Sequence, residues 1–349
     1  MAMTGLERIF ATLRHKEPDR VPHFEGSIDE KVMQQILPDK LEEDFIEYMD
    51  LDAAVVHYRW FTKYDMIDES KHLARDQWGS LVRFTSELLP HPTEQAIKSE
   101  KDLDTYVPPD PDEEWRYETI EKLVKRFKGK RAIIPCLPDI WNVVKDSLLG
   151  DEWYLTAMIE NPALIQRISE IPLDFFIKFI RNCVSAGADI IWVHGDWAGT
   201  KYPFASPKHT EKLIAPYLKR LVDECHKLGV PCLKHTDGNI WPVKDILIKT
   251  GIDALHPIDP SAGLDMGIAK AEIGDKVCLM GNVSCIDVLP DGTAEEIRQA
   301  TKECIQKGGK GGGLICASSN SIHSGVPGEN YVTFVKAIHE YGKYPLELE

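Results

Sequence analysis

The sequence predicts an α/β protein in which strands and helices alternate along the chain. From about residue 107 onward, short apolar runs typical of buried strands are separated by longer segments with the period of amphipathic helices. The phrases SAGADI, KLGVPC and KTGIDA each place a glycine, a frequent helix-ending residue, just before such a run. Strands joined by helices run parallel, so we expect a parallel sheet covered by helices.

Eight segments are candidates for the strands of this sheet. They share a short apolar run and comprise residues 21–26, 52–57, 131–135, 188–193, 230–234, 253–256, 277–280 and 313–317. Eight strand–helix units close into a TIM barrel, whereas fewer units with a switch point form a doubly wound sheet. No GxGxxG motif follows a strand, and GKGGGL at 309–314 precedes one, which is the wrong side for a phosphate loop. We therefore predict a single (β/α)8 TIM barrel that takes up residues 1–349 as one domain.

Helix signals fill the gaps between these runs. Capping-box patterns start helices at Thr4, in an N-terminal extension before the barrel, and at Thr293. Ser206, followed by a proline, gives a third helix start, and residues 38–49 have a helical pattern. The period is lost over residues 61–98, where DQWGSLVRF is typical of a hairpin. We expect an excursion from the barrel in that region.

Composition excludes several classes of partner. The chain has 41 Lys and Arg against 56 Asp and Glu, a formal charge of −15, which argues against nucleic-acid binding. No segment approaches the roughly 20 apolar residues that span a bilayer, and the N-terminus has no signal-peptide apolar core. The eight cysteines form no CxxC pair, which indicates free thiols in a reducing compartment, so we expect a cytoplasmic protein. Its acidic surface is compatible with a monomer or a homodimer.

Polar side chains gather where the predicted strands end. In a parallel barrel the active site lies at the C-terminal strand ends, and His57, His194, His235 and His256 all fall at such ends. The same ends and the loops after them carry further residues that we expect to bind substrate: Tyr58, Trp60, Asp139, Trp141, Asp196, Trp197, His256, Asn282 and Asn320. Any one of them could instead be a structural histidine or a helix cap. Random placement of twelve histidines would scatter them, so the joint pattern indicates one site.

His235 and Asp237 form a candidate metal-binding pair. Residues two apart in an extended segment project to the same face, and a histidine with a carboxylate suits zinc or another borderline divalent metal. A metal site needs a third ligand, and we predict that Cys316 supplies it. The other candidates are His57, His194, Glu25 and His256, and a plain hydrogen-bonding role for the pair is the alternative to a metal.

Aromatic residues follow several of the same strand ends. They are Tyr58, Trp60, Trp141, Trp197, Tyr202 and Phe204. If they line a cavity rather than the core, the cavity suits a flat organic substrate better than a sugar phosphate.

Five stretches of the chain resemble the uroporphyrinogen decarboxylase superfamily, which includes cobalamin-dependent methyltransferases. They are LRHKEPDRVP at 13–22, SPKHTEKLIAPYLKRLVDECHKLGVPCLKHTDGNIWPV at 206–243, TGIDALHPIDPSAGLDM at 250–266, KVCLMGNVSCIDVLPDGTAEEI at 276–297 and GGLICASSNSIHSGVPGENY at 312–331. The resemblance covers most of the chain in order. It implies a single TIM barrel, in agreement with the strand pattern.

Departures from the family patterns narrow the expected activity. The decarboxylases carry an R-Q-A-G-R motif where this chain has HFEGS at 23–27, a substrate-binding Asp near the position of Arg59, and a His in the final strand loop where Asn320 stands here. Porphyrinogen decarboxylation is therefore not expected. The thiol-directed methyltransferases bind zinc through His-x-Cys and a later Cys, whereas this chain has His235 and Asp237, then Asn320, with Cys316 four residues earlier.

The resemblance therefore implies the demethylating branch of these methyltransferases. Such an enzyme takes a methyl group from a small methylated donor, above all a methoxylated aromatic, and passes it to the Co(I) centre of a separate corrinoid protein. His235, Asp237, His194 and His57 are the expected catalytic residues, because a Lewis acid or proton donor at the ether oxygen helps the phenolate to leave.

Two other functions stay open. One is a lyase acting on another carboxylated aromatic, for which Arg59, Lys201 and Lys234 are the available cations. The other is a non-catalytic barrel that binds a tetrapyrrole or corrinoid. The chain lacks the DxHxxG pattern of corrinoid carrier domains, so we do not expect it to hold cobalamin on its own.

Overall fold

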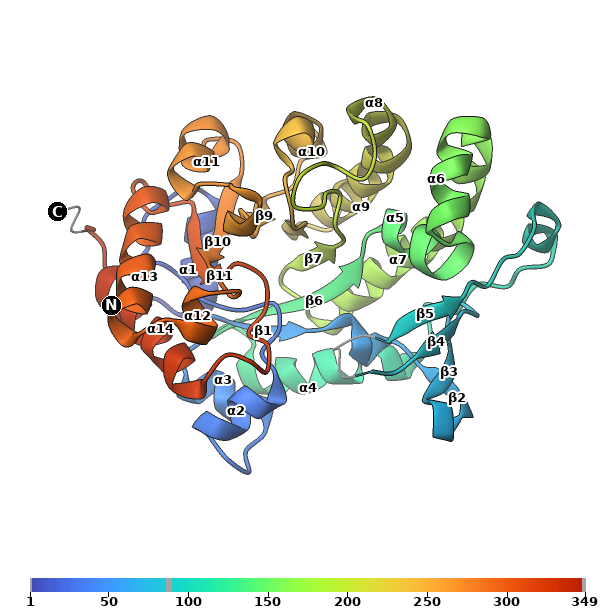
Figure 1. The fold of residues 1–349 in the computed structure, drawn as a ribbon. Helices are drawn as coiled ribbons and strands as arrows, with labels where there is room; N and C mark the ends of the chain where they lie inside the picture. The colour runs from blue at the N-terminus through green and yellow to red at the C-terminus, as the bar shows by residue number, and fades with distance from the viewer. Residues whose placement is uncertain (1, 86–89, 347–349) are drawn as a thin grey trace.

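The computed structural model describes residues 2–85 and 90–346 and contains a curled sheet of seven parallel strands. The strands follow one another in chain order, so each pairs with its sequence neighbours in the sheet (Figure 1). They are β1 Ala53–Val56, β6 Ala132–Pro138, β7 Ile191–His194, β8 Cys232–His235, β9 Ala254–His256, β10 Cys278–Val283 and β11 Leu314–Ser318. Seven of the eight predicted strands are thus confirmed, and the chain has a TIM-barrel-like α/β fold.

The prediction of an eighth strand at 21–26 is wrong, although this segment does lie between the two edge strands. The Cys316 amide of β11 donates to the Pro22 carbonyl at 3.0 Å, and the Asp52 amide before β1 donates to the His23 carbonyl at 2.8 Å. Two other backbone amides at this junction donate hydrogen bonds to side-chain carboxyl groups instead of to backbone carbonyls. The His23 amide donates to Asp52 Oδ2 at 2.7 Å, and the Ser318 amide donates to Glu25 Oε1 at 3.0 Å. Pro22 has no amide hydrogen to give, which removes one backbone hydrogen bond that a regular ladder would have at this position.

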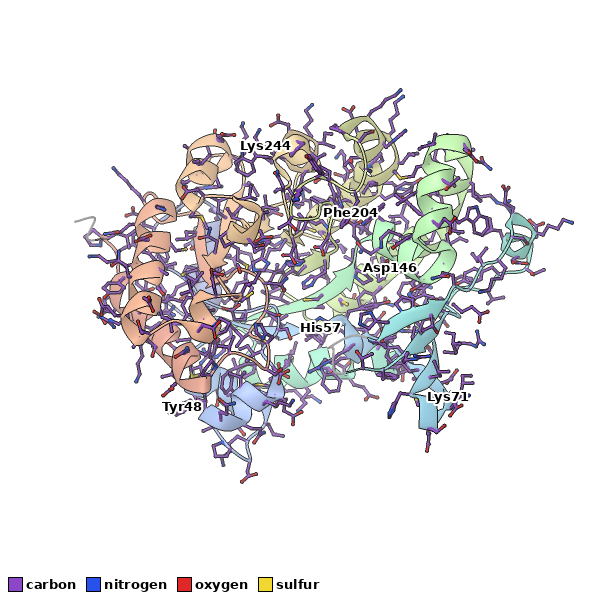
Figure 2. The ribbon with its side chains drawn as sticks, viewed as in Figure 1. Tyr48, His57, Lys71, Asp146, Phe204 and Lys244 are labelled. Atoms are coloured by element: carbon purple, nitrogen blue, oxygen red, sulfur yellow. The ribbon has the colours of Figure 1, made fainter. Side chains whose placement is uncertain are left out.

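The excursion predicted over 61–98 is confirmed as a four-stranded antiparallel sheet beside the barrel (Figure 1). Its strands are β2 Tyr64–Asp68, β3 Leu73–Asp76, β4 Leu81–Arg83 and β5 His91–Glu94. Residues 86–89 of the predicted excursion lie outside the described part of the chain. Trp78 attaches this sheet to the barrel helices, because its ring packs edge-on against Phe175 with the ring centres 5.2 Å apart. Figure 2 shows Lys71 on the excursion.

Helices pack around the outside of the parallel sheet. They are α1 Gly5–Leu13, α2 Glu30–Ile36, α3 Glu42–Tyr48, α4 Glu118–Phe127, α5 Ile140–Asn142, α6 Asp151–Glu160, α7 Pro162–Ala186, α8 Pro207–His209, α9 Ala215–Lys227, α10 Lys244–Ile248, α11 Met266–Ile273, α12 Val288–Asp291, α13 Ala294–Gly308 and α14 Gly328–Tyr341. The capping boxes at Thr4 and Thr293 are both present. The predicted helix at 38–49 is the shorter α3, and α2, whose N-cap is Asp29, was not predicted. No described helix has the length and apolarity to cross a membrane.

The core has two layers that divide at the parallel sheet. The inner layer fills the barrel with side chains from alternate strand positions, including Ile134, Trp192, Leu233, Met280 and Ile315. The outer layer lies between the sheet and the helices. All eight cysteines are buried and free in the structure.

The N-terminal helix is tied to the start of β1 by a buried carboxylate. Asp52, whose side chain is fully buried, pairs with Arg8 of α1 at 2.9 Å and with Arg20 at 2.7 Å. This network lies before β1, at the opposite end of that strand from His57.

Candidate active site and metal centre

Three neighbouring strands of the barrel each end in a histidine. His194, His235 and His256 are the last residues of β7, β8 and β9, and the strand register places them side by side. The His194 and His235 ring centres are 5.1 Å apart, and those of His235 and His256 are 5.0 Å apart. His57, just after β1, lies with its ring centre 6.1 Å from that of His194. The structure therefore brings together all four histidines that the strand-end pattern singled out.

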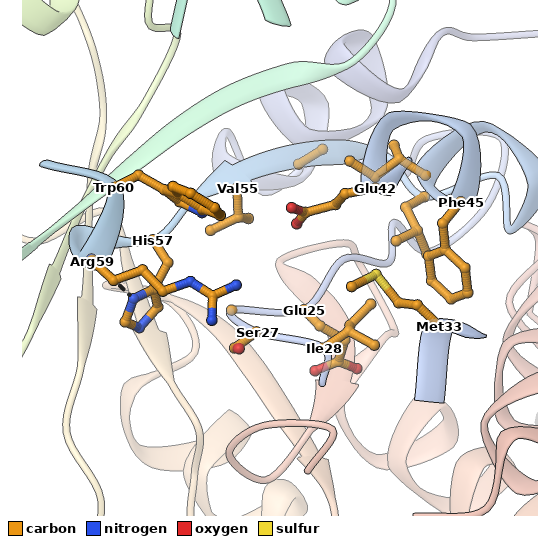
Figure 3. Close-up of a pocket in the computed structure, with 14 residues that line it drawn as sticks. Glu25, Ser27, Ile28, Met33, Glu42, Phe45, Val55, His57, Arg59 and Trp60 are labelled. Carbon is orange, nitrogen blue, oxygen red and sulfur yellow. Dashed lines mark hydrogen bonds between the residues drawn. The ribbon is translucent and has the colours of Figure 1, made fainter. Parts of the chain in front are cut away.

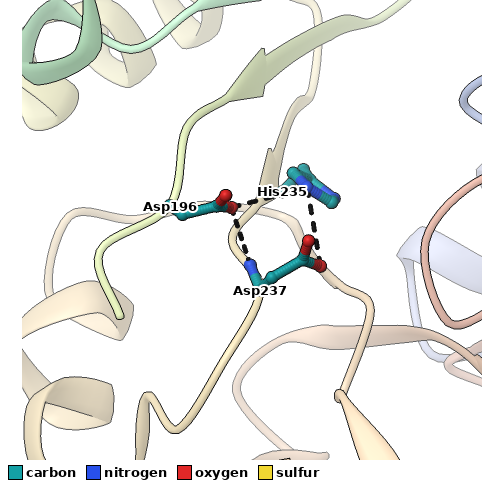
Figure 4. Close-up of side chains that lie close together, drawn as sticks. All are labelled: Asp196, His235 and Asp237. Carbon is teal, nitrogen blue, oxygen red and sulfur yellow. Dashed lines mark hydrogen bonds and ion pairs between the residues drawn. The ribbon is translucent and has the colours of Figure 1, made fainter. Parts of the chain in front are cut away.

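Asp196, His235 and Asp237 form a compact group of metal-ligating atoms (Figure 4). His235 Nε2 lies 3.6 Å from Asp196 Oδ1 and 3.6 Å from Asp237 Oδ1, and one ligand atom from each residue falls within 4.8 Å of the others. The Asp237 amide donates to Asp196 Oδ1 at 2.9 Å, and the Asn320 side-chain amide donates to Asp237 Oδ2. Asp237 Oδ1 is buried without a hydrogen-bond partner.

Hydrogen bonds behind His235 fix which ring nitrogen carries its proton. His256 Nε2 lies 3.2 Å from the Ser318 carbonyl, which can only accept, so this nitrogen carries the hydrogen. In a neutral His256 ring, Nδ1 is then an acceptor, and His235 Nδ1, 2.8 Å away, must be the donor. His235 Nε2 is left with a free lone pair directed at the two carboxylates. Histidine binds a metal in this tautomeric form, with a hydrogen bond from its other ring nitrogen holding the ring in place.

Burial and mutual repulsion favour the uncharged forms of these groups. Burial, then the charges of Lys234 and His57, lowers the pKa of His235 to about 3, and burial lowers the pKa of His256 well below its usual value. Burial, then repulsion by Asp196 and Asp259, raises the pKa of Asp237 to about 8. A divalent cation such as zinc would fit this group, because it would displace the Asp237 proton and supply the positive charge that the neighbouring carboxyl groups lack.

The structure replaces Cys316 with Asp196 as the third candidate ligand. Cys316 belongs to the outer core layer and its thiol lies against that of Cys304, so the prediction that Cys316 completes the site is wrong. Asp196 was expected only to bind substrate. A usable signal was present in the sequence, because His194 and Asp196 repeat the H-x-D spacing of His235 and Asp237 at the end of the neighbouring strand.

Several predicted substrate-binding residues are engaged in holding the site together. Asp139 forms a fully buried ion pair with Lys234 at 2.8 Å and accepts a hydrogen bond from Trp197 Nε1 at 2.9 Å. Trp141 Nε1 donates to the Asp196 carbonyl at 3.0 Å. These contacts hold in place the loop that carries Asp196.

Three further predictions of substrate contact do not match the geometry. Both ring nitrogens of His256 are engaged, with His235 and Ser318, so this residue positions His235 instead of facing the mouth. The Tyr58 hydroxyl accepts a hydrogen bond from Gln77 at 2.6 Å and so turns toward the excursion. The Asn282 side-chain amide donates to the Ile258 carbonyl at 3.1 Å.

His194 is the histidine whose ring faces the site without a fixed partner. Its Nε2 atom is buried and has no hydrogen-bond partner. The ring lies on Trp192, with the ring centres 4.8 Å apart, and burial together with the neighbouring histidines lowers its pKa well below the usual value. A buried neutral imidazole with an orphaned nitrogen is suited to exchange a hydrogen bond with a bound ligand.

A small pocket lies beside His57, which forms part of its lining (Figure 3). Its apolar lining comes from α2, α3 and β1, and His57, Arg59 and Glu25 supply the polar groups. Glu25 is fully buried and accepts hydrogen bonds from the Ser318 amide and hydroxyl, at 3.0 and 2.7 Å. Burial raises the pKa of Glu25 to about 8, so this side chain is protonated near neutral pH.

Comparison with known proteins places the chain in a family. A model of the family "Uroporphyrinogen decarboxylase (URO-D)" matches residues 72–341. The uroporphyrinogen decarboxylase of Psychromonas ingrahamii is 26% identical over 304 residues, which cover 83% of this chain and 79% of that protein. The Vibrio cholerae uroporphyrinogen decarboxylase is 27% identical over 268 residues, covering 72% of this chain and 71% of the other.

Solved structures share the fold. A methyltransferase from Methanosarcina mazei superposes with a TM-score of 0.75 at 18% identity, covering 97% of this chain and 99% of the other. A B12-independent methionine synthase from Shewanella superposes with a TM-score of 0.50 at 12% identity, covering 93% of each chain. These likenesses confirm the TIM-barrel-like architecture. The match to the family model over most of the sequence shows that this chain belongs to the uroporphyrinogen decarboxylase family.

Proposed function

We propose that this protein is a methyltransferase that moves a methyl group from a methoxylated aromatic to the Co(I) centre of a separate corrinoid protein. The observation that carries the proposal is the Asp196, His235 and Asp237 group at the strand ends, with a pocket nearby that His57 lines. A divalent cation bound there supplies Lewis acidity toward an ether oxygen, which makes an otherwise basic phenolate a better leaving group.

The electrons and atoms of the reaction balance without an external oxidant. Co(I) provides the electron pair of the new cobalt–carbon bond, and the bond between the methyl carbon and the ether oxygen breaks. That oxygen keeps the electron pair of the broken bond and takes up one proton to become a phenol.

The chain's own residues orient the donor and manage that proton. His194 Nε2 is buried and unpartnered, so it can hydrogen-bond the ether or phenol oxygen. Glu25 holds a proton near neutral pH because burial raises its pKa to about 8, which makes it a proton reserve beside the pocket. The exposed Phe204 ring, which stacks on the buried Trp141 ring at 6.3 Å between centres, offers a flat apolar surface near the same loop.

The comparisons support methyl transfer at the level of the fold. One solved structure of similar architecture is described as a methyltransferase, and this fold accommodates that activity. The sequence relatives are described as uroporphyrinogen decarboxylases, which makes decarboxylation the second candidate. A lyase acting on an acidic aromatic needs a cationic pocket. Lys234, one of the three cations expected to serve, is paired with Asp139 inside the barrel.

Methyl transfer can be tested with reduced cobalamin as the acceptor. The zinc-loaded protein is incubated anaerobically with cob(I)alamin and a panel of methoxyarenes, methylamines and methyl thiols, with chromatography of the products. We expect loss of the Co(I) absorbance and formation of a phenol from at least one methoxyarene, with the His235→Ala variant inactive. Absence of transfer from every donor to both cob(I)alamin and a Co(I) corrinoid protein would overturn the proposal. Release of carbon dioxide from an aromatic acid without any corrinoid would favour the lyase.

A further inference from the structure

A second cavity, here called the outer cavity, is lined by residues of β1, of the turn after β1 and of the helices α3 and α4. Its volume is about 230 Å³. An apolar cavity of about 150 Å³ is enough to hold benzene, so the outer cavity can hold a substituted ring or a short alkyl chain. None of the four strand-end histidines belongs to its lining, so it is separate from the candidate metal centre.

Aliphatic side chains form the inner walls of the outer cavity, and its rim is exposed. Ile46 of α3, Val56 of β1 and Leu123 of α4 line it and are 5%, 1% and 6% exposed. At the rim, Leu41 and Trp60 are 59% and 50% exposed. A concave apolar surface that remains open to water is typical of a ligand site, because a bound apolar group removes that surface from water.

Glu42 brings an unpaired carboxylate into the outer cavity. Within residues 2–85 and 90–346, no Lys, Arg or His nitrogen lies within 4.0 Å of its oxygens. Figure 3 shows this carboxylate turned toward Val55 and Trp60, which also line the outer cavity. Desolvation raises the pKa of Glu42, and the charge of Arg59 opposes that shift without cancelling it, as expected of a carboxylate without a close cation.

The other two charges in the lining are paired with each other. Glu43 of α3 and Lys122 of α4 form an ion pair at 2.5 Å. Their charges cancel, so ionised Glu42 leaves the outer cavity with a net negative charge. An anionic ligand would be repelled there and a neutral one would leave Glu42 unpaired, whereas a cation would form a charge-assisted hydrogen bond with it.

We infer that the outer cavity binds a small hydrophobic amine, whose ammonium group pairs with Glu42 and whose ring or alkyl chain packs between α3, β1 and α4. The inference does not depend on the proposed methyl transfer. Val55 and Trp60 line both the outer cavity and the small pocket that contains His57. A bound amine would therefore contact the turn that follows β1, next to the strand-end histidines.

Binding of two matched probes tests the inference without turnover. Benzylamine and benzyl alcohol share a ring, and only the amine is cationic at pH 8, which lies above the usual pKa of a carboxyl group and below that of an alkyl amine. Ligand-observed NMR titrations compare the two probes on the wild type, Glu42→Gln, Glu47→Gln and Thr119→Trp. Glu47 belongs to the same helix but lies outside the outer cavity, so Glu47→Gln is the matched control for a lost surface charge.

We expect the wild type to bind benzylamine at least about fivefold more tightly than benzyl alcohol. Glu42→Gln should abolish this preference and leave the affinity for the alcohol within about twofold. Thr119 lines the outer cavity, so the bulky side chain of Thr119→Trp should weaken the binding of both probes at least about tenfold. Glu47→Gln should resemble the wild type.

Three results would overturn the inference. Equal wild-type affinities for the two probes would show that the outer cavity does not select a cation. An amine preference that survives Glu42→Gln would place the amine elsewhere on the acidic surface, and undiminished binding in Thr119→Trp would place both probes outside the outer cavity. The competing interpretation is that Lys122 serves Glu42 as well as Glu43, and it predicts an amine preference in Lys122→Gln that is missing from the wild type.

Discussion

His235 and His256 face each other with their Nδ1 atoms 2.8 Å apart, a distance at which one ring must donate and the other must accept. The Ser318 carbonyl on the far side of His256 decides the direction. The His235 lone pair is therefore presented to Asp196 and Asp237 by residues that do not themselves touch the metal position.

Replacing His256 should weaken metal binding although it supplies no ligand atom. In His256→Ala the proton on His235 Nδ1 loses its acceptor, and the ring loses the contact that orients it. We expect zinc affinity to fall by about 10–100-fold, measured by competition with a chromophoric chelator. His91→Ala, at an exposed position of β5, is the control and should bind zinc normally. Unchanged affinity in His256→Ala would show that this residue has no positioning role.

Zinc should stabilise the folded protein through His235. A ligand present at 100 times its Kd and bound only to the native state adds about 2.7 kcal/mol to the free energy of unfolding. We expect zinc to raise the Tm of the wild type and of His91→Ala, and to leave the Tm of His235→Ala unchanged. Addition of EDTA should reverse the increase. A zinc-dependent shift of the same size in His235→Ala would place the ion elsewhere.

Glu25 should make stability fall as the pH rises. Burial raises its pKa from the ordinary value of 4.5 to about 8, so between these values the folded state holds a proton that the unfolded state has lost. The free energy of unfolding then decreases by about 1.4 kcal/mol per pH unit in this window. Glu25→Gln cannot ionise, and its amide can keep both contacts with Ser318. In urea unfolding at pH 5, 6, 7 and 8, the free energy of unfolding of the variant should increase relative to that of the wild type at each step. A difference that stays constant with pH would contradict the assignment.

Removing the charge of Asp52 should destabilise the fold without affecting the site. Asp52→Asn leaves Arg8 and Arg20 with a neutral partner in a buried position, for which we expect a loss of about 3 kcal/mol in urea unfolding. Asp50, which also pairs with Arg20 but is 55% exposed, is the matched control, and Asp50→Asn should cost less than about 1 kcal/mol. Zinc affinity should be unchanged in both variants, since Asp52 lies at the other end of β1. Similar losses in the two variants would mean that burial does not strengthen the Asp52 network.

The sequence was sufficient to predict the order of the strands and the edge of the sheet that holds the site. Glycines at helix ends and apolar runs after them mark each strand–helix unit, and Gly187, Gly229 and Gly251 do adopt the positive φ expected of helix-ending residues. Because parallel strands end at one edge, the histidines that terminate them had to meet.

The role of Cys316 could not be predicted in the same way. β11 is apolar on both faces, with Ile315 and Ala317 inside the barrel and Leu314 and Cys316 outside. A strand buried on both sides has no polar alternation to show which face is which, so the direction of the thiol was not encoded locally. The same limit applies to the segment at 21–26, where carboxylates that are distant in the sequence replace the carbonyls of a ladder.

That segment gives the barrel a seam. The other six joins of the parallel sheet are regular strand pairings, whereas β11 and β1 are bridged by residues 21–26 through Pro22, His23 and the carboxylates of Glu25 and Asp52. A wall with few backbone bonds opens at lower free energy than a continuous ladder. The seam also carries Glu25 and Gly26 of the pocket beside His57, so this pocket borders the stretch of the barrel wall that lacks a regular strand pairing.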